Sequence, residues 1–308
     1  MKAIFCTKYG PPEVLKFKFI NKPVPKPGEV LIKIKATAVN SGDVRVRGLA
    51  VNGLMRVIMS IVLGFSKPRN PILGSVFSGI VAETGDKVNL FKTGDEVYGM
   101  TGLKMGTYAD YIVVKENSPI TLKPLKASFE EAAAIIFGGS TAIYFLKKAK
   151  IELKPNSEVL IYGATGSVGT SAIQIAKHYK ARVTADCSEA GFDLVQSLGA
   201  DEVVNYRKND FPKTGTKYDI IFDAVGKIKK KDWAKFLSKD GVFVSVGTLD
   251  VASESIDQLL FLKDLFDSQH LKAVIDRTYS FEKMVEAHRY VDTGRKKGNV
   301  VVLVNQES

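Results

Sequence analysis

Short apolar runs separated by polar turns fill the first third of the chain. Residues 30–36 alternate between apolar and polar side chains, and shorter strand-like runs follow at residues 77–83, 96–98 and 108–114. Alternation with a period of two is typical of a strand that buries one face. Many short strands joined by glycine- and proline-containing turns predict a compact, partly closed β domain.

An apolar segment, LMRVIMSIVLGF at residues 54–65, interrupts this pattern. It is too short to span a bilayer, and it carries Arg56. Two interpretations stay open, since the segment suits a buried core helix and also the exposed apolar lip of a substrate pocket or subunit contact.

The spacing of apolar residues changes from Ser128 onward. Residues 129–135 and 141–148 have the period of two helices, and Ser128 with Glu131 forms the pattern of a capping box. Strand-like and helix-like segments then alternate. The expected strands are 159–162, 182–187, 202–205, 218–223 and 242–246, and the expected helices are 173–179, 192–198 and 233–237. Such alternation predicts an α/β fold with a doubly wound parallel sheet.

The last expected elements are a helix at 281–290 and a strand at 300–304. They lie beyond the last strand–helix unit of the parallel sheet. We therefore expect the final strand to return to the first, β-rich domain.

Three glycines follow the apolar run 159–162 and open a helical pattern. In the spacing G-x-G-x-x-G, Ala164 stands at the first position with Gly163 before it, and Gly166 and Gly169 fill the other two. Gly166 lets the backbone approach a pyrophosphate, Gly169 lets the helix pack tightly on the strand, and the first helical N–H groups point at the anion. This strand–turn–helix context predicts a dinucleotide site.

Composition and charge narrow the class of protein. A length of 308 residues suggests two domains, and 45% hydrophobic residues are typical of a soluble globular protein without a membrane span. The net charge of +11 arises from lysine-rich stretches without interleaved aromatics, so it favours solvated faces and a phosphate-bearing cofactor over nucleic acid. With two cysteines and no signal peptide, we expect a reducing, cytoplasmic location.

Several stretches, taken together and in order, resemble one family over nearly the whole chain. They are YGPPEVL (9–15), VNSGD (39–43), GTYADY (106–111), GATGSVG (163–169), LGAD (198–201), FDAVG (222–226) and GNVV (298–301). The chain resembles the quinone oxidoreductase (zeta-crystallin-like) branch of the medium-chain dehydrogenase/reductase superfamily. The resemblance implies a GroES-like catalytic domain at 1–123, a Rossmann domain at 124–270, and a return to the catalytic domain at 271–308, with NAD(P)H between the domains.

The zinc-dependent members of that superfamily carry an early cysteine, a Gly-His-Glu stretch and a four-cysteine lobe. Here the matching region is GSVFSG at residues 74–79, Cys6 lies in the first strand, and the histidines are His178, His270 and His288. No set of three or four ligands can be assembled, so we expect no zinc. The resemblance then implies hydride transfer from NAD(P)H to a small quinone or α,β-unsaturated carbonyl substrate.

The resemblance also implies the site residues. Asn40 and Thr141 would face the nicotinamide, and Asp43 would lie near the same wall, although residues 40–43 also suit an ordinary turn and Thr141 an early-turn helix residue. Tyr98 and Tyr108 are candidate proton donors, but core or hinge packing is favoured for each, and water can protonate the product. The catalytic set is Asn40, Thr141 and Asp43. The cofactor-binding set is Asn40, Thr141, Gly163, Gly166, Ser167, Val168, Gly169, Ser188, Tyr206, Val225, Gly226 and Asn299.

The choice between NADPH and NADH rests on conflicting residues. Asp186 lies about where a carboxylate would bind the ribose of NAD, whereas Ser188, Tyr206 and the pair Arg207-Lys208 suit a 2′-phosphate. The family pattern places Cys187 at the carboxylate position. We expect Asp186 to point past the strand end into water, which favours NADP(H), with NAD(H) as the alternative.

Other functions stay open at this point. An enoyl-thioester reductase, or a redox-silent NADPH-binding protein of the crystallin-like or RNA-binding kind, would have the same fold. A homodimer is one option, but the short connection at 249–258 departs from the family near the sheet edge that its dimers use.

Overall fold

The computed structural model describes residues 1–49, 60–205, 215–247 and 252–304, which form two compact units. Unit 1 consists of Met1–Ile136, Glu254–Lys263 and Ile275–Ser308, and unit 2 consists of Phe137–Ser253 and Asp264–Val274. The domain limits expected from the sequence, at residues 123 and 270, stay a prediction.

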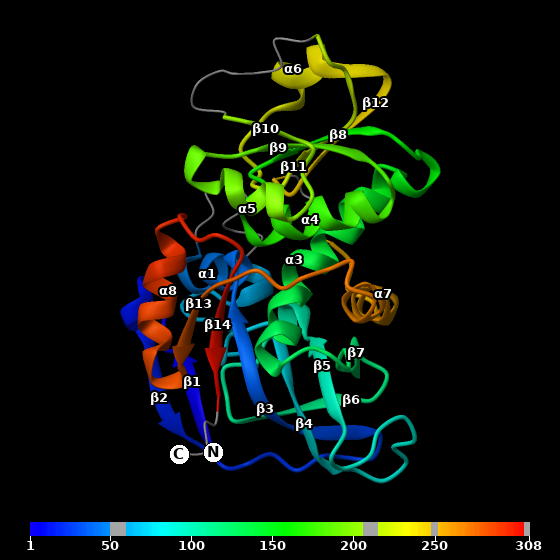
Figure 1. Ribbon diagram of the computed structural model, residues 1–308. Coiled ribbons are helices and arrows are strands. Elements are labelled where there is room, and N and C mark those ends of the chain that lie inside the picture. Colours follow the sequence, from blue (N-terminus) through cyan, green and yellow to red (C-terminus); the bar gives the residue numbers. More distant parts are fainter. Residues whose placement is uncertain (50–59, 206–214, 248–251, 305–308) are drawn as a thin grey trace. The chain divides into compact units, whose positions relative to one another are not determined.

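A mostly antiparallel sheet forms the centre of unit 1 (Figure 1). Within the described residues its strand order is β13-β14-β3-β4-β5-β7, with β6 paired to β3, and β1 and β2 form a separate pair. The strands are β1 (Lys2–Cys6), β2 (Leu15–Phe19), β3 (Glu29–Val39), β4 (Val76–Thr84), β5 (Glu96–Met100), β6 (Tyr111–Lys115), β7 (Ile120–Leu122), β13 (Ile275–Ser280) and β14 (Asn299–Leu303).

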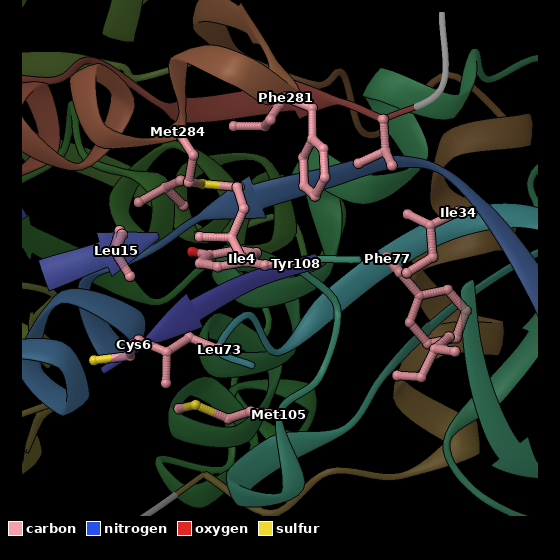
Figure 2. Packing of buried hydrophobic residues seen from close by; sticks show 14 of the residues in the cluster. Ile4, Cys6, Leu15, Ile34, Leu73, Phe77, Met105, Tyr108, Phe281 and Met284 are labelled. Carbon is pink, nitrogen blue, oxygen red and sulfur yellow. The ribbon is translucent and has the colours of Figure 1, made fainter. Parts of the chain in front are cut away.

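The long strand β3 joins distant parts of the chain into this sheet. It pairs antiparallel with β4 and β6 and also with β14, where Val39 lies opposite Val300. Its inward side chains, such as Ile34, pack with Phe77, Tyr108 and Met284 in one apolar core (Figure 2). Burial of these side chains is the main force that holds the C-terminal strand in unit 1.

Two helices flank the ends of this sheet. Helix α1 (Ser41–Gly48) follows β3 directly, and α8 (Met284–Asp292) lies between β13 and β14 in the chain. Asn40 caps α1 with a capping box that includes Asp43. Because such a cap satisfies N–H groups that the helix itself leaves free, the sequence Asn-Ser-Gly-Asp favours the start of a helix here.

Unit 2 contains a fully parallel sheet with strand order β10-β9-β8-β11-β12 in the described residues. Its strands are β8 (Glu158–Tyr162), β9 (Arg182–Asp186), β10 (Glu202–Val204), β11 (Tyr218–Asp223) and β12 (Leu237–Ser245). The helices of the strand–helix units are α4 (Ser167–His178), α5 (Phe192–Ser197) and α6 (Lys230–Trp233). The order 3-2-1-4-5 is that of a Rossmann-type sheet.

Two helices, α3 (Phe129–Lys148) and α7 (Ile256–Asp267), contribute residues to both units. The capping box expected at Ser128 and Glu131 is present. The expected break before residue 141 is wrong, because α3 is continuous. Gly138 has a packing role, since a Cβ there would lie 2.2 Å from the carbonyl oxygen of Ser167.

Helix α3 is also the one described segment that is long and apolar enough to cross a membrane. However, 67% of its apolar window is buried within the protein. Burial of this kind accounts for the apolar composition of α3 as that of a core helix.

The apolar segment at 54–65 is only partly described, since residues 54–59 lie outside the described ranges. Residues 60–63 are helical. Leu63 packs into the core of unit 1, whereas Ile61, Val62 and Phe65 are exposed. The described part therefore has both a buried and an exposed apolar face.

Candidate functional site

The turn after β8 is built around Gly163. Its φ is +77°, and a Cβ added there would lie 2.1 Å from Cγ2 of Val225. The N–H of Gly163 donates to the carbonyl oxygen of Asp186 at 3.0 Å. Only glycine combines this left-handed backbone with so close a neighbour. The turn thus brings together the carboxyl ends of β8, β9 and β11.

The two following glycines have different roles. A Cβ on Gly169 would lie 2.4 Å from the carbonyl oxygen of Gly163, so Gly169 is required for α4 to pack against the turn. Gly166 is the N-cap of α4, has φ −74° and provides no side-chain cap. Among the described residues, a Cβ on Gly166 would meet only that same carbonyl oxygen, at an ordinary 3.6 Å. The described part of the chain therefore leaves open the space that a side chain at the α4 N-cap would fill, as a bound pyrophosphate requires.

The topology of the sheet places this turn at a switch point. Strand β8 lies between β9 and β11, so the loops after β8 and β11 lead away in opposite directions. In open parallel sheets, ligands bind outside the carboxyl ends of the strands at this position. Val225 and Gly226 follow β11, and the contact of Val225 with the Gly163 turn places them beside it.

Asp223 holds the loop after β11 in shape. Its fully buried carboxylate accepts hydrogen bonds from the N–H groups of Val225, Gly226 and Ile228 and from the hydroxyl of Ser245 at 2.8–3.1 Å. Gly226, with φ +81°, lies so close to Gly247 that a Cβ would be 2.7 Å from its Cα. The role of Asp223 was not predicted from the sequence. A carboxylate at the end of a buried strand, three residues before a glycine, is the local pattern that could have indicated it.

The expected orientation of Asp186 is wrong. Its side chain is fully buried rather than pointing into water. Strand β9 is an interior strand, in which Asp186 pairs with Tyr162 on one side and Val204 on the other, and strand side chains project onto the faces of the sheet, where covering segments exclude water. Ser188, two residues on, is partly exposed. Its loop packs against the glycine turn, where a Cβ on Gly191 would lie 2.3 Å from Cγ2 of Thr165.

Thr141 lies in unit 2, on α3, one turn beyond the contact of Gly138 with Ser167. Its hydroxyl donates to the carbonyl oxygen of Phe137 at 2.7 Å, which leaves the oxygen able to accept a hydrogen bond. Ser167 and Val168 form the first turn of α4, and both side chains are largely buried. Their backbone N–H groups, rather than their side chains, are suited to bind an anion.

Asn40 and Asp43 lie together in unit 1. Oδ1 of Asn40 accepts hydrogen bonds from the N–H groups of Gly42 and Asp43 at 2.8 and 3.1 Å. The Asn40 amide nitrogen, Nδ2, therefore faces Ser75 and donates to its Oγ at 2.9 Å. The Asp43 carboxylate completes the capping box, because its Oδ2 accepts from the N–H of Asn40 at 3.0 Å. The Ser75 hydroxyl donates to Oδ1 of Asp43 at 3.4 Å.

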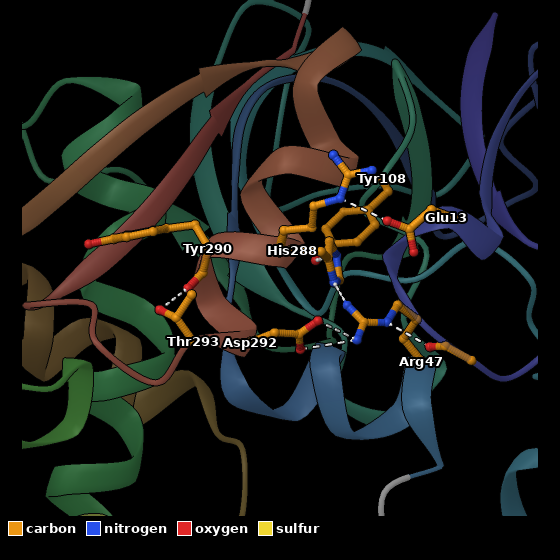
Figure 3. A network of polar contacts seen from close by, with 9 residues as sticks. Glu13, Arg47, Tyr108, His288, Tyr290, Asp292 and Thr293 are labelled. Carbon is orange, nitrogen blue, oxygen red and sulfur yellow. Dashed lines mark hydrogen bonds and ion pairs between the residues drawn. The ribbon is translucent and has the colours of Figure 1, made fainter.

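A buried polar network extends from Asp43 through Tyr108 to the C-terminal helix α8. Figure 3 shows the part of it that joins Tyr108, His288, Arg47 and Asp292. The Tyr108 hydroxyl donates to Oδ2 of Asp43 at 3.0 Å and lies 3.2 Å from Nε2 of His288. Nδ1 of His288 lies 3.0 Å from Nη1 of Arg47. Nη2 of Arg47 donates to the two carboxylate oxygens of Asp292 at 3.0 and 2.7 Å. Tyr108 is thus a member of a polar network as well as of the core.

Burial sets the charge states in this network. It lowers the pKa of His288 to about 3, with the Arg47 charge acting in the same direction, so the imidazole is neutral. It raises the pKa of Asp43 to about 7, against the lowering effect of donors from Asn40, Tyr108 and Ser75. Asp43 is therefore a carboxyl group that changes protonation near neutral pH.

The remaining residues that were predicted from the sequence lie in both units. Tyr98 is fully buried and donates its hydroxyl to the carbonyl oxygen of Leu259. Asn299 is buried at the start of β14. Tyr206, Arg207 and Lys208 lie outside the described residues. Asn40 and Asp43 belong to unit 1, whereas Thr141, Ser188 and the glycine turn belong to unit 2.

Comparisons with known proteins match both parts of the chain. The model of the alcohol dehydrogenase GroES-like domain matches residues 26–124, and that of the zinc-binding dehydrogenase matches residues 167–292. The 2-methylene-furan-3-one reductase of Solanum lycopersicum is 34% identical over 98% of this chain and 79% of that protein. The chain belongs to the medium-chain dehydrogenase/reductase family. The family and the combination of a GroES-like domain with a Rossmann sheet, both predicted from the sequence, are confirmed.

Further relatives place this medium-chain dehydrogenase/reductase among the quinone and alkenal reductases. A chloroplastic NADPH-dependent alkenal/one oxidoreductase of Arabidopsis thaliana is 31% identical over 98% of this chain and 79% of that protein. The solved structure of the quinone oxidoreductase from Coxiella burnetii has a TM-score of 0.88 and 30% identity, and the match covers 99% of each chain. The prediction of an oxidoreductase of this branch is confirmed.

One of the two matching family models is that of the zinc-binding dehydrogenases, although zinc is not expected from the sequence. In the ranges that the structure describes, no three His, Cys, Asp or Glu side chains are grouped to hold a metal ion. At the position where zinc-dependent members have histidine, Ser75 bonds to Asn40 and Asp43. The absence of zinc stays a prediction.

Proposed function

We propose that this protein uses NADPH to reduce α,β-unsaturated carbonyl compounds or quinones without a metal ion. The observation that carries the proposal is the glycine turn at the switch point of a parallel sheet, where Gly166 leaves the α4 N-terminus open. The relatives described above are named as a 2-methylene-furan-3-one reductase, an NADPH-dependent alkenal/one oxidoreductase and a quinone oxidoreductase.

The residues present fit such a cofactor. Backbone N–H groups of Ser167, Val168 and Gly169 would bind the pyrophosphate, and the loop that Asp223 shapes would line the adjoining ribose. Asn40, Thr141 and Asn299 would contact the nicotinamide half. When bound, the reduced nicotinamide supplies a hydride to an activated double bond. The chain's own residues then orient the substrate carbonyl and stabilise the negative charge that develops on its oxygen.

The activity test is NADPH oxidation by the purified protein against matched panels of quinones, enones and enoyl thioesters. We expect turnover with enones or quinones and little with enoyl thioesters. Cofactor binding without turnover of any panel member would identify a redox-silent binding protein instead. A cytoplasmic location and a homodimer remain predictions that fractionation and sedimentation would test.

NADPH is the proposed cofactor because the Arabidopsis relative is named for it and because Ser188 follows β9 partly exposed. We expect Ser188→Asp to lower kcat/KM for NADPH relative to NADH by about tenfold or more, since a carboxylate there repels a 2′-phosphate. Steady-state kinetics with both cofactors give this ratio.

The matched control for this variant is Asp186→Asn. Because Asp186 is buried inside the sheet, we expect the ratio to change by less than about threefold. A wild-type preference for NADH that Asp186→Asn abolishes would show that Asp186 binds the ribose and that the choice of NADPH is wrong.

We also expect activity to be independent of metal ions. Dialysis against a strong chelator should change neither kcat nor Tm, because the described chain offers no cluster of metal-binding side chains. Elemental analysis before and after dialysis is the measurement. Stoichiometric zinc that is lost together with activity would contradict the prediction.

A further inference from the structure

The hydrogen-bond directions around Asp43 follow from groups that can act in only one way. Arg47 can only donate, so Nδ1 of His288 accepts and its proton lies on Nε2, which donates to the Tyr108 oxygen. The Tyr108 O–H must then donate to Oδ2 of Asp43. Oδ2 also accepts from the Asn40 N–H and is therefore an acceptor in both of its bonds.

A proton carried by Asp43 must consequently lie on Oδ1, which faces Ser75. The Oγ of Ser75 is itself fixed on one side, because the Asn40 amide donates to it. Two arrangements remain. An ionised Asp43 accepts from the Ser75 O–H, whereas a protonated Asp43 donates to Oγ and releases the Ser75 hydrogen to point elsewhere.

We propose that Ser75 transfers a proton from Asp43 to the reduced substrate, an inference that rests on the proposed function. Ser75 keeps 8% of its surface exposed, while Asp43 has none, so Ser75 is the member of the pair that can touch a substrate. Ser75 would be a catalytic residue, and Asp43, Tyr108 and His288 act through it.

The proposed relay moves two protons after the hydride has been added. Hydride addition to the β-carbon of an enone supplies two electrons and leaves an enolate anion. The Ser75 O–H bond breaks as its proton moves to the enolate oxygen, and the Asp43 O–H bond breaks as its proton moves to Ser75 Oγ. Asp43 ends as a carboxylate, and the enol becomes the ketone in water. After product release, water at Ser75 returns a proton by the reverse path.

The surroundings of Asp43 suit this task. The donors that face it are the Asn40 N–H and Tyr108 on Oδ2 and Ser75 on Oδ1, while neutral His288 separates it from the Arg47–Asp292 ion pair. Burial raises the pKa of Asp43 to about 7 in spite of these donors. An acid whose pKa lies near the working pH is the most effective general acid.

The test uses an enone that the wild type reduces. We expect Asp43→Asn and Ser75→Ala each to lower kcat by about 100-fold or more with little change in KM, and Ser75→Thr, which keeps the hydroxyl, to retain most of the activity. Wild-type kcat should fall as pH rises through the pKa of Asp43, and Asp43→Asn should lack this step. Tyr108→Phe removes a donor to the carboxylate, so it should move the step to higher pH.

Infrared titration of the cofactor-free protein gives an independent readout. A protonated carboxyl band that disappears near neutral pH should be absent in Asp43→Asn and should persist to higher pH in Tyr108→Phe. An inactive wild type would overturn the proposed function and the relay with it. An active wild type whose Asp43→Asn variant keeps full kcat, or whose kcat does not follow the infrared titration, would overturn the relay alone.

Discussion

Replacing Gly166 by valine is expected to weaken NADPH binding by well over tenfold, or more than about 1.4 kcal/mol, while the protein stays folded. Gly166 has φ −74°, and within the described ranges a Cβ there would meet only the Gly163 carbonyl oxygen, at 3.6 Å. The added side chain therefore fits the protein but occupies the space in front of the α4 N-terminus, where the pyrophosphate would bind. Calorimetric titration of the variant with NADPH measures the loss.

Gly169→Ala is the contrasting control in the same turn. Its Cβ would lie 2.4 Å from the Gly163 carbonyl oxygen, so α4 must shift and the protein should lose stability rather than affinity alone. Valine at the N-cap costs α4 up to about 1 kcal/mol, which a melting curve would show separately. An unchanged Kd for NADPH in folded Gly166→Val would place the cofactor elsewhere.

The glycine turn and the parallel sheet could be predicted because their signals are local. Strands β8 and β11 are short apolar runs, and the glycines recur at fixed offsets after β8, so a window of a few residues contains the whole pattern. The turn at Asn40 is local too, since its capping box spans residues 40–43. Sequence reasoning reached these features without knowledge of the tertiary structure.

The polar network could not be predicted, because its members are far apart in the chain. Tyr108 is 65 residues from Asp43, and His288 is 180 residues from Tyr108. They meet only because β14 returns to pair with β3 and α8 packs beside α1. A histidine among the apolar residues of α8 was the sole local hint, and such a residue is compatible with simple burial.

Asp186 shows a second limit of sequence reasoning. Its position at the end of an apolar run indicated an exposed carboxylate, and this is wrong because the side chain is fully buried. Whether a strand-end side chain is exposed depends on the segments that cover that face of the sheet. Those segments lie elsewhere in the chain, so the burial cannot be read from the strand itself.

The pH dependence of stability should reveal the two buried titratable groups with opposite signs. Asp43 has its pKa raised from 3.8 to about 7, so between these values the folded state binds a proton that the unfolded state lacks, and stability falls as pH rises. His288 has its pKa lowered from 6.5 to about 3, so in that range the unfolded state binds the extra proton, and stability rises with pH.

Removing either group should therefore change the slope of the free energy of unfolding against pH, with a sign that follows from the direction of its pKa shift. We expect the free energy of unfolding of Asp43→Asn, relative to wild type, to rise by about 1.4 kcal/mol per pH unit between the two pKa values of Asp43. For His288→Gln the difference from wild type should fall by a similar amount per unit across the range of His288. Urea unfolding at several pH values gives both differences.

Circular dichroism is the suitable probe for this experiment, because the single tryptophan, Trp233, lies in unit 2 whereas Asp43 and His288 lie in unit 1. For the double variant the two differences from wild type should cancel where the ranges overlap, because on folding the wild type binds one proton at Asp43 and releases one at His288. Parallel profiles for wild type and Asp43→Asn would mean that Asp43 keeps its ordinary pKa in the folded protein. The carboxyl group would then be ionised at neutral pH and could not supply the proton that Ser75 transfers.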